Sequence, residues 1–314
     1  MGSVKDLTVL EKVSEHKEGL GLFKFSDRYS VFDYGEMPDL IPQKGAALCK
    51  MASYNFEQLE KQGVYSHFIE QVSVLEMKVK LIRILDPVKN ELPQHPKNCL
   101  VPLEIIFRNS LPAGSSLLKR FASGQVRPED FGLKKIPEAG EKLKEPIMDV
   151  STKLEDHDRY LSWKDAKDLS SLSETQLAEL KYLAGEVNEF ITLHAEKIGL
   201  EHADGKIEFG LDANGKLMLV DVLGTLDENR FLFQGIHLSK QVLRDYYKTL
   251  PWYQEYVEQA NNAIPPKLPS ELISLVSEMY QSVCNAWCHE HVFDVPRYSE
   301  VIQKYQEFLE KSKT

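Results

Sequence analysis

The most informative stretch of the chain lies at residues 206–221 and reads KIEFGLDANGKLMLVD. Two runs that are typical of β-strands flank residues 212–215, Asp-Ala-Asn-Gly, and a turn sequence of this kind between two strands predicts a hairpin. We expect Leu211 to pair with Lys216, which sets the register of the two antiparallel strands.

This register places three charged side chains on one face of the hairpin. Lys206 lies directly opposite Asp221, and Glu208 lies diagonal to Asp221 at roughly 7–8 Å between backbones. Two carboxylates beside a lysine suit an oxygen-ligated Mg²⁺ that is shared with the phosphates of a nucleotide. The alternative is a solvated cross-strand salt bridge, because antiparallel hairpins usually have a polar outer face, and a one-residue slip would separate the groups. The opposite face is apolar and consists of Ile207, Phe209, Met218 and Val220.

The first hundred residues are expected to form strands and one helix. Residues 20–25 are a short apolar run, and residues 45–61 place apolar side chains at helical spacing before Gly63. Residues 71–85 alternate apolar and polar side chains for much of their length, which predicts a half-buried strand.

A further strand is predicted at residues 100–108. Alternation along a strand puts Glu104 and Arg108 together on one face. The other face is apolar and carries Leu103, Ile105 and Phe107.

The second half of the chain is expected to contain long loops and two helices. Residues 122–160 are polar and contain proline, with little periodicity, which favours functional loops. A capping box at Ser173 and Gln176 begins a long amphipathic helix that ends at Gly199. Residues 261–266 form a surface loop, and Pro269-Ser270 opens the last helix, which continues toward Cys288.

Three potential zinc ligands lie at the end of that last helix. Cys284, Cys288 and His291 fall at positions i, i+4 and i+7, on one helical face. Aromatic neighbours such as Trp287 favour a place in the core instead, and no second pair of ligands is evident elsewhere. We therefore predict that this cluster binds no metal.

The composition is that of an ordinary globular protein. The chain has 314 residues, 42% of them hydrophobic, and a formal net charge of −10 without a basic cluster, which argues against nucleic-acid binding. No apolar run reaches the roughly 20 residues that cross a bilayer, and the first ten residues lack a signal core. The four cysteines are too few for a disulfide scaffold and are expected to be reduced thiols, so we predict a cytoplasmic protein without membrane partners.

Seven blocks of the chain, taken together and in order, resemble the SAICAR synthetase (phosphoribosylaminoimidazole-succinocarboxamide synthase) family. The resemblance runs from about Gly2 to the last helix, and the ordered set is more specific than any one block. The blocks are DRYSVFD at 27–33, IPQKG at 41–45, VPLEIIFR at 101–108 with AGS at 113–115, STK at 151–153 with His157-Asp158, KIEFG at 206–210, Asp227 with Arg230, and Lys240-Gln241 with Arg244-Asp245.

This resemblance implies an α+β fold with two lobes, antiparallel sheets and packed helices, related to the ATP-grasp and kinase-like folds. We expect a β-rich nucleotide-binding lobe at residues 1–98 and an α+β lobe with the substrate and metal site at residues 99–314. The implied reaction uses ATP and Mg²⁺ to join carboxyaminoimidazole ribotide (CAIR) to L-aspartate through an amide bond. A homo-oligomer is also conceivable, because relatives are often oligomeric.

The resemblance assigns roles to residues that match the family's motifs. The ribotide 5′-phosphate is assigned to Arg108, Ser115 and Arg230, although without the resemblance Arg108 would be read as a surface ion-pair partner of Glu104 and Arg230 as a solvated loop charge. Glu208 and Asp221 match the magnesium ligands. The remaining assignments are Lys206 and Asp204 as catalytic residues, with Asp204 orienting Lys206 or a substrate group; Gly2, Lys5 and Glu104 toward ATP; and Asp33, Lys153, His157 and Asp158 in the substrate cleft.

Three departures from the family pattern leave other functions open. Ser3 replaces a basic residue of the phosphate loop, Val222 replaces a glutamate, and Leu226 replaces a proline. One alternative is a paralogue that joins an amino acid to a different phosphorylated carboxylate. Another is a catalytically weakened protein that senses nucleotides.

Overall fold

The computed structural model describes residues 4–32, 34–89, 91–155, 157–238, 240–258 and 263–311. Its elements, in chain order, are β1 Lys5–Glu11, β2 Gly19–Phe25, α1 Lys44–Lys61, β3 Phe68–Gln71, β4 Glu76–Leu81, β5 Cys99–Ser110, α2 Ser116–Ala122, a 3₁₀ turn Pro128–Phe131, β6 Lys142–Thr152, α3 Trp163–Ser170, α4 Glu174–Lys197, β7 Glu201–Leu211, β8 Leu217–Val220, β9 Asn229–Phe233, β10 Ile236–His237, α5 Gln241–Lys248, α6 Pro251–Glu258, α7 Ser270–Cys288 and α8 Tyr298–Lys311.

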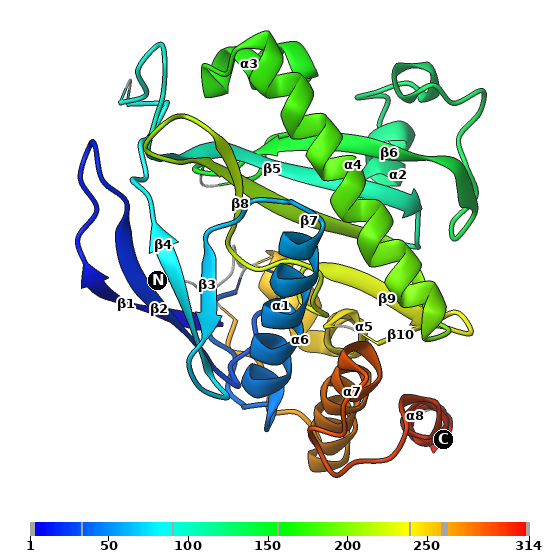
Figure 1. Cartoon of the computed structure of the whole chain (residues 1–314). Helices are drawn as coiled ribbons and strands as arrows, with labels where there is room; N and C mark the ends of the chain where they lie inside the picture. Colours follow the sequence, from blue (N-terminus) through cyan, green and yellow to red (C-terminus); the bar gives the residue numbers. More distant parts are fainter. Residues whose placement is uncertain are drawn as a thin grey trace.

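These elements form two antiparallel sheets with helices packed against them (Figure 1). The small sheet has the strand order β1-β2-β4-β3, and the large sheet has the order β10-β9-β7-β5-β6, with β8 paired to β7. This confirms the predicted α+β class. The division at residue 98 stays a prediction: each side of it carries one sheet, and a single apolar cluster includes Met77 of the small sheet and Ile105 of the large one.

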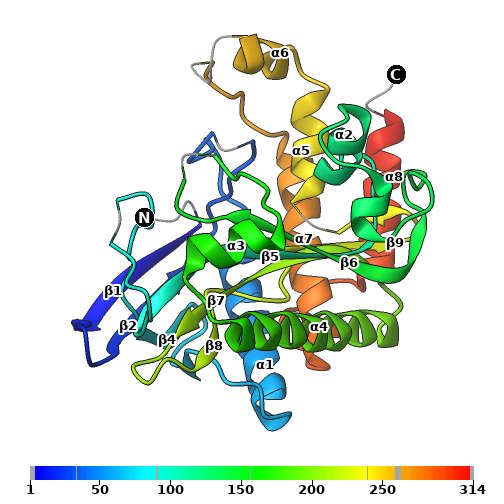
Figure 2. The same ribbon diagram turned by 90° about the horizontal axis from the view of Figure 1, so that it is seen from above.

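The large sheet has one apolar face, which helix α4 covers (Figure 2). Ile105 and Phe107 of β5 pack in the same cluster as Ile207 of β7 and as Leu180 and Ile191 of α4. Because side chains alternate along a strand, the intervening residues of β5 and β7 project from the opposite face. That second face carries the candidate site.

Several predicted elements are confirmed by the structure. Strand β2, helix α1, strand β5 and helix α7 lie where the sequence pattern placed them. Helix α4 begins with the predicted capping box, in which the Ser173 hydroxyl accepts a bond from the Gln176 amide N–H at 3.2 Å and the Gln176 side chain accepts one from the Ser173 N–H at 3.1 Å. Capping and amphipathic spacing are local properties, which is why they could be read from the sequence.

Three predicted features are wrong. Residues 71–85 do not form one strand, because a turn at residues 73–75 separates β3 from β4. Residues 122–160 are not only loops, since part of this stretch forms strand β6, which pairs with β5. Helix α7 is not the last, because α8 follows it. The first half of β6, residues 142–146, is largely exposed. This half forms a strand because β6 pairs with β5, and the local sequence pattern does not show that pairing.

The predicted hairpin forms, but its register is shifted by one residue. Glu208 pairs with Val220 and Leu211 with Leu217, so that Asp212 faces Lys216 across a three-residue loop. Gly215 has φ +85° and supplies the left-handed residue that such a loop requires. The Asp212 carboxylate also accepts bonds from the backbone N–H groups of Asn214 and Lys216, both at 2.8 Å, which stabilises this shorter loop.

The shift changes which apolar residues of β8 face the core. Leu217 and Leu219 join the main cluster, whereas Met218 and Val220 pack with Leu100 on the face of Glu208. Asp221 lies beyond the end of β8 and is not opposite Lys206.

A buried histidine, His202 of β7, sits in a polar network inside the large sheet. Its Nδ1 lies 2.8 Å from the Thr192 hydroxyl and 3.2 Å from the Asn109 amide nitrogen, and its Nε2 lies 3.0 Å from the Asn229 amide oxygen. The amide of Asn229 in turn needs the space beside Gly205, where a Cβ would approach its oxygen to 1.8 Å. Burial lowers the pKa of His202 to about 4.

This histidine makes stability depend on pH. Between pH 6.5 and 4 the unfolded chain binds a proton at this position and the folded chain does not, so stability falls as the pH falls through this window. We expect His202 to account for about 2 kcal/mol of lost stability between pH 7 and pH 5. Urea unfolding of the wild type and of His202→Gln at both pH values measures this, and equal pH dependence in the two proteins would contradict it.

Candidate active site on the large sheet

Charged side chains of β5 and β7 lie on the face of the large sheet opposite α4. The register of β5 and β7 pairs Glu104 with Glu208, Ile106 with Lys206, and Arg108 with Asp204. Paired residues of antiparallel strands project from the same face. The prediction that Glu104 and Arg108 share a face is therefore confirmed, and β5 and β7 form the centre of the site.

The first group on this face consists of carboxylates and lysines that bond to one another, and we call it the carboxylate–lysine group. The Glu104 carboxylate accepts bonds from Lys153 Nζ at 2.9 Å and from Lys206 Nζ at 2.7 Å. Lys153 Nζ also donates to Glu208 at 2.7 Å, so it bridges the two glutamates. Four residues to which the resemblance assigned separate roles thus lie in one group.

Asp221 joins this group from the end of β8. It adopts φ +64°, and its carboxylate forms an ion pair with Lys5, which belongs to β1 of the small sheet. Burial raises the pKa of Asp221, but the ion pair and hydrogen bond with Lys5, together with the charge of Lys153, hold this pKa below its ordinary value. For Glu208, burial and the repulsion of Asp221 raise the pKa to about 7 in spite of Lys153.

The pair Glu208 and Asp221 fits a magnesium ion. Glu208 is buried and Asp221 is half-buried, and their carboxylates repel each other. A divalent cation would relieve this repulsion, and oxygen donors are the ligands that Mg²⁺ prefers. In the described ranges, no three His, Cys, Asp or Glu side chains are grouped so as to hold a metal. Mg²⁺ bound here would therefore take its remaining ligands from nucleotide phosphates and water.

The second group on this face is an arginine cluster, which we define as Arg108, Arg120, Arg230, Asp149 and Asp204. Arg230 binds Asp204 through two N–H groups, with Nε to Oδ1 at 2.7 Å, and Arg108 Nη1 lies 3.8 Å from Asp204. Arg108 Nη2 donates to Asp149 at 3.1 Å, and Arg120 Nη1 donates to the same oxygen at 2.6 Å.

Arg108 is held deep within this cluster. Its side chain is 2% exposed, its Nε has no hydrogen-bond partner, and its Nη1 lies 3.5 Å from the Ser115 hydroxyl. A buried N–H group without a partner is costly. Nε has no partner and Nη1 has only long contacts, one with the Ser115 hydroxyl and one with Asp204, which also binds Arg230.

The geometry corrects three interpretations of single residues. Arg108 pairs with Asp149 and not with Glu104. Asp204 binds the arginines and does not orient Lys206, whose partner is Glu104. The proposed salt bridge between Lys206 and Asp221 does not form, because the register shift separates them.

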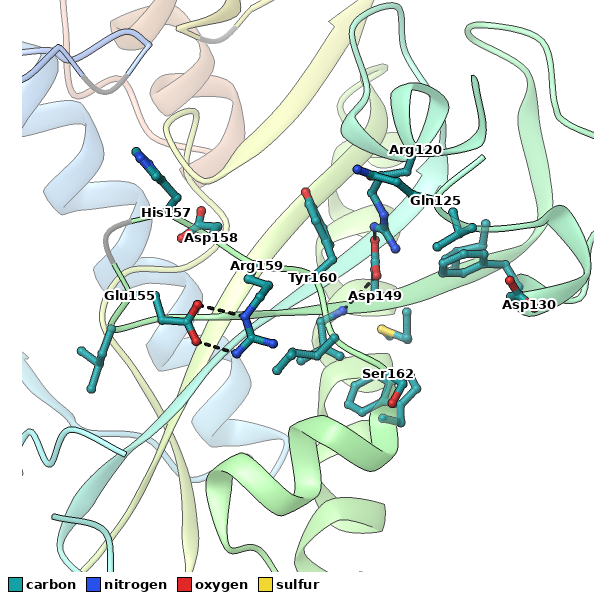
Figure 3. Close-up of a pocket in the computed structure, with 18 of the residues that line it drawn as sticks. Arg120, Gln125, Asp130, Asp149, Glu155, His157, Asp158, Arg159, Tyr160 and Ser162 are labelled. Carbon is teal, nitrogen blue, oxygen red and sulfur yellow. Dashed lines mark hydrogen bonds and ion pairs between the residues drawn. The ribbon is translucent and has the colours of Figure 1, made fainter. Parts of the chain in front are cut away.

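The other predicted residues are placed as follows. His157 and Asp158 are exposed and line a cavity of about 1480 Å³, together with Asp149 and Arg120 (Figure 3). Lys5 and Glu104 lie in the carboxylate–lysine group described above. Gly2, Ser3 and Asp33 lie outside the described residues.

Sequence reasoning missed residues that complete both groups. Asp149 and Arg120 lie in or beside the stretch that the sequence predicted to be loops. The alternation of apolar Met148 and Val150 with polar Asp149 and Ser151 was the signal that could have identified a strand there. Lys44 and Asp227 were part of the family motifs without an assigned role.

Lys44 and Asp227 form a buried ion pair between α1 and the segment before β9. Lys44 Nζ donates to Asp227 at 2.7 Å, and the Tyr280 hydroxyl of α7 donates to the second carboxylate oxygen at 2.6 Å. Burial raises the pKa of Asp227, but Lys44 and Lys240 outweigh it and lower this pKa to about 2.

The cysteine cluster at the end of α7 is split between core and solvent. Cys284 and Cys288 are buried, whereas the His291 side chain is exposed and lies 3.9 Å from Asp294. We expect protein that is purified without affinity metals to contain no stoichiometric zinc, because the three side chains do not share one environment. Elemental analysis tests this, and zinc that is lost in Cys288→Ser would contradict it.

Comparisons with known proteins agree with the resemblance. The family model described as SAICAR synthetase matches residues 8–261. A protein of Archaeoglobus fulgidus, provisionally named phosphoribosylaminoimidazole-succinocarboxamide synthase, is 47% identical and is covered completely by 99% of this chain. The synthase of Thermoplasma volcanium is 35% identical, over 83% of this chain and 90% of its own length.

Solved structures share the fold. SAICAR-synthase from Saccharomyces cerevisiae complexed with SAICAR has a TM-score of 0.68 at 23% identity, over 92% of this chain and 94% of the other. A SAICAR synthetase in complex with ADP has a TM-score of 0.61 at 23% identity, over 85% of this chain and 99% of the other. The family match and the similarity to full-length relatives together show that the chain belongs to the SAICAR synthetase family.

Proposed function

We propose that the protein is an ATP-dependent ligase that joins CAIR to L-aspartate and releases SAICAR, ADP and phosphate, as a step of purine biosynthesis. The observation that carries this proposal is the pairing, on one sheet face, of an arginine cluster with a carboxylate–lysine group. The names of the relatives and the ADP and SAICAR complexes of two structural neighbours support it.

The reaction needs activation of a carboxylate. A free carboxylate is a poor electrophile because its oxygen is a poor leaving group, whereas an acyl phosphate has a stabilised one. Phosphate transferred from ATP to the CAIR carboxylate is then displaced by the aspartate amine, and an amide and free phosphate result. The protein's task is to position three substrates and to neutralise charge.

The two groups divide this task. Arg108, Ser115 and Arg230 would hold the 5′-phosphate, because the planar fork of arginine matches phosphate oxygens. Lys153 and Lys206 would stabilise negative charge that develops near the reacting carboxylate. Mg²⁺ held by Glu208 and Asp221 would supply Lewis-acid stabilisation of the transferred phosphoryl group.

Two departures from the family pattern lie in the core and not in the site. Val222 and Leu226 are 5% and 0% exposed and belong to the main apolar cluster. Substitutions there act on packing, so neither alternative function gains support from them.

A phosphate-release assay tests the proposal. ATP, Mg²⁺, CAIR and L-aspartate are supplied together and then each is omitted in turn. We expect release only with the complete mixture and formation of SAICAR, and release that is independent of CAIR would contradict the assignment.

Location and assembly remain predictions. The free cysteines support a cytoplasmic protein, and a homo-oligomer is tested by light scattering. Among the helices in the described part of the chain, none is long and apolar enough to span a membrane.

The arginine assignment predicts a selective loss of ribotide affinity. Arg108→Ala and Arg230→Ala should each raise the KM for CAIR roughly 10- to 100-fold, the effect of losing a charge-assisted bond, with little change in the KM for ATP. Arg127→Ala is the matched control, because its side chain is 76% exposed and pairs only with Asp130 in the described structure. Equal losses for ATP and CAIR would show that the phosphate site is misassigned.

A further inference from the structure

In the described part of the chain, Arg120 of α2 and Asp149 of β6 are linked to the proposed phosphate site through Arg108. The Asp149 oxygen that accepts from Arg108 also accepts from Arg120. Both side chains are about nine-tenths buried or more. Figure 3 shows them facing each other beside the ring of Tyr160.

These residues close a ring of contacts around one end of Arg108. The Arg120 guanidinium lies over the Tyr160 ring at 4.0 Å, and the Tyr160 hydroxyl is 2.5 Å from the Ser116 hydroxyl. Ser116 accepts a bond from Arg108 Nη2 at 3.1 Å, the same nitrogen that donates to Asp149. The ring therefore occupies Nη2, while Nε lacks a partner and Nη1 makes only long contacts.

The charges of the arginine cluster show what Arg120 contributes. Three guanidinium groups face two carboxylates, which leaves one net positive charge. Without Arg120 the remaining four residues would be neutral as a set, and Asp149 would have Arg108 as its sole cationic partner within the cluster. A neutral Arg108–Asp149 pair attracts a phosphate far less than a cluster that carries excess positive charge.

We propose that Arg120 is a positioning residue that offsets the charge of Asp149 and so keeps Arg108 available for the phosphate of the substrate. This inference rests on the proposed function, because it concerns the 5′-phosphate of the ribotide. Arg120 acts through Asp149 and does not itself contact the ligand. Tyr160 and Ser116 hold the pair in place.

The test compares Arg120→Gln with the double variant Arg120→Gln/Asp149→Asn. Arg120→Gln should raise the KM for CAIR roughly 10-fold, with the KM for ATP and kcat within about 2-fold of wild type. The double variant restores the net charge of the cluster and should recover the KM to within about 3-fold of wild type. Lys119→Gln is the matched control, since it removes one charge from the exposed side of the same helix.

A binding measurement separates this inference from the proposed function. Calorimetry with SAICAR and with its dephosphorylated riboside should show that Arg120→Gln weakens the phosphorylated ligand alone. A wild type that turns over CAIR, combined with an unchanged KM in Arg120→Gln, overturns the inference but not the function. A wild type that binds neither CAIR nor SAICAR overturns both.

Three further outcomes also decide whether Arg120 acts through its charge. A double variant that is no better than Arg120→Gln, or equal losses for SAICAR and its riboside, would show that the pair has a structural role only. Arg120→Lys keeps the charge but loses the planar stack on Tyr160, so its KM for CAIR should rise less than that of Arg120→Gln, by about 3-fold. A 10-fold rise in Arg120→Lys would overturn the charge-based account.

Discussion

Replacing Glu208 by Gln is expected to reduce kcat roughly 100- to 1,000-fold, the size of effect seen when a group that stabilises transition-state charge is removed. Asp221→Asn should have a similar effect. Both variants keep the size of the side chain and one acceptor oxygen but remove a negative charge beside the proposed metal position. The Mg²⁺ concentration for half-maximal rate should rise as well, because each change weakens an oxygen ligand.

The fold should survive these changes. Glu208 projects from the polar face of β7, whereas the packing of that strand comes from Ile207 and Phe209 on the reverse. Glu70→Gln is the control, since Glu70 pairs with Lys78 on an exposed surface where an ion pair contributes about 0–1 kcal/mol. Wild-type turnover and Mg²⁺ dependence in both site variants would show that this is not the metal site.

Replacing Lys44 by Met is expected to destabilise the protein by about 3–5 kcal/mol, because it removes the cation that bonds the buried Asp227 carboxylate and leaves it the Tyr280 hydroxyl and the charge of Lys240. The side chains of Lys44 and Asp227 are 0% and 2% exposed, so water cannot replace the lost partner. The midpoint of urea unfolding measures the effect.

A double variant distinguishes the ion pair from simple packing. Lys44→Met/Asp227→Asn removes both charges and should recover much of the lost stability, because no buried charge is then unpaired. Lys78→Met, at an exposed pair, should cost less than about 1 kcal/mol. A double variant that is as unstable as Lys44→Met would mean that Lys44 acts through its packing alone.

Much of the site could be predicted because strand alternation is a local rule. It placed Glu104 and Arg108 on one face of β5, with Ile105 and Phe107 on the other, and the structure confirms both faces. Helix α4 was equally predictable, since its capping box involves residues three positions apart.

The pairing partners could not be predicted in the same way. Lys153 reaches Glu104 and Glu208 because β6, β5 and β7 are neighbours in the large sheet, and this strand order depends on how the whole core is buried. The hairpin register shows the same limit. All four residues of β8 are apolar, so its sequence is compatible with two registers, and the bonds of Asp212 in the loop stabilise the one that forms.

The sequence by itself therefore determined the family, the α+β class that the family implies, the helices α1, α4 and α7, and the two faces of β5. Only the tertiary structure decided that Asp221 pairs with Lys5 of the other sheet, and that Asp149 joins Arg108 to Arg120. The physical reason is the distance along the chain over which each effect acts. Propensity, capping and alternation act over a few residues, whereas the partner of a buried charge is selected by the folding of segments that lie far apart in the chain.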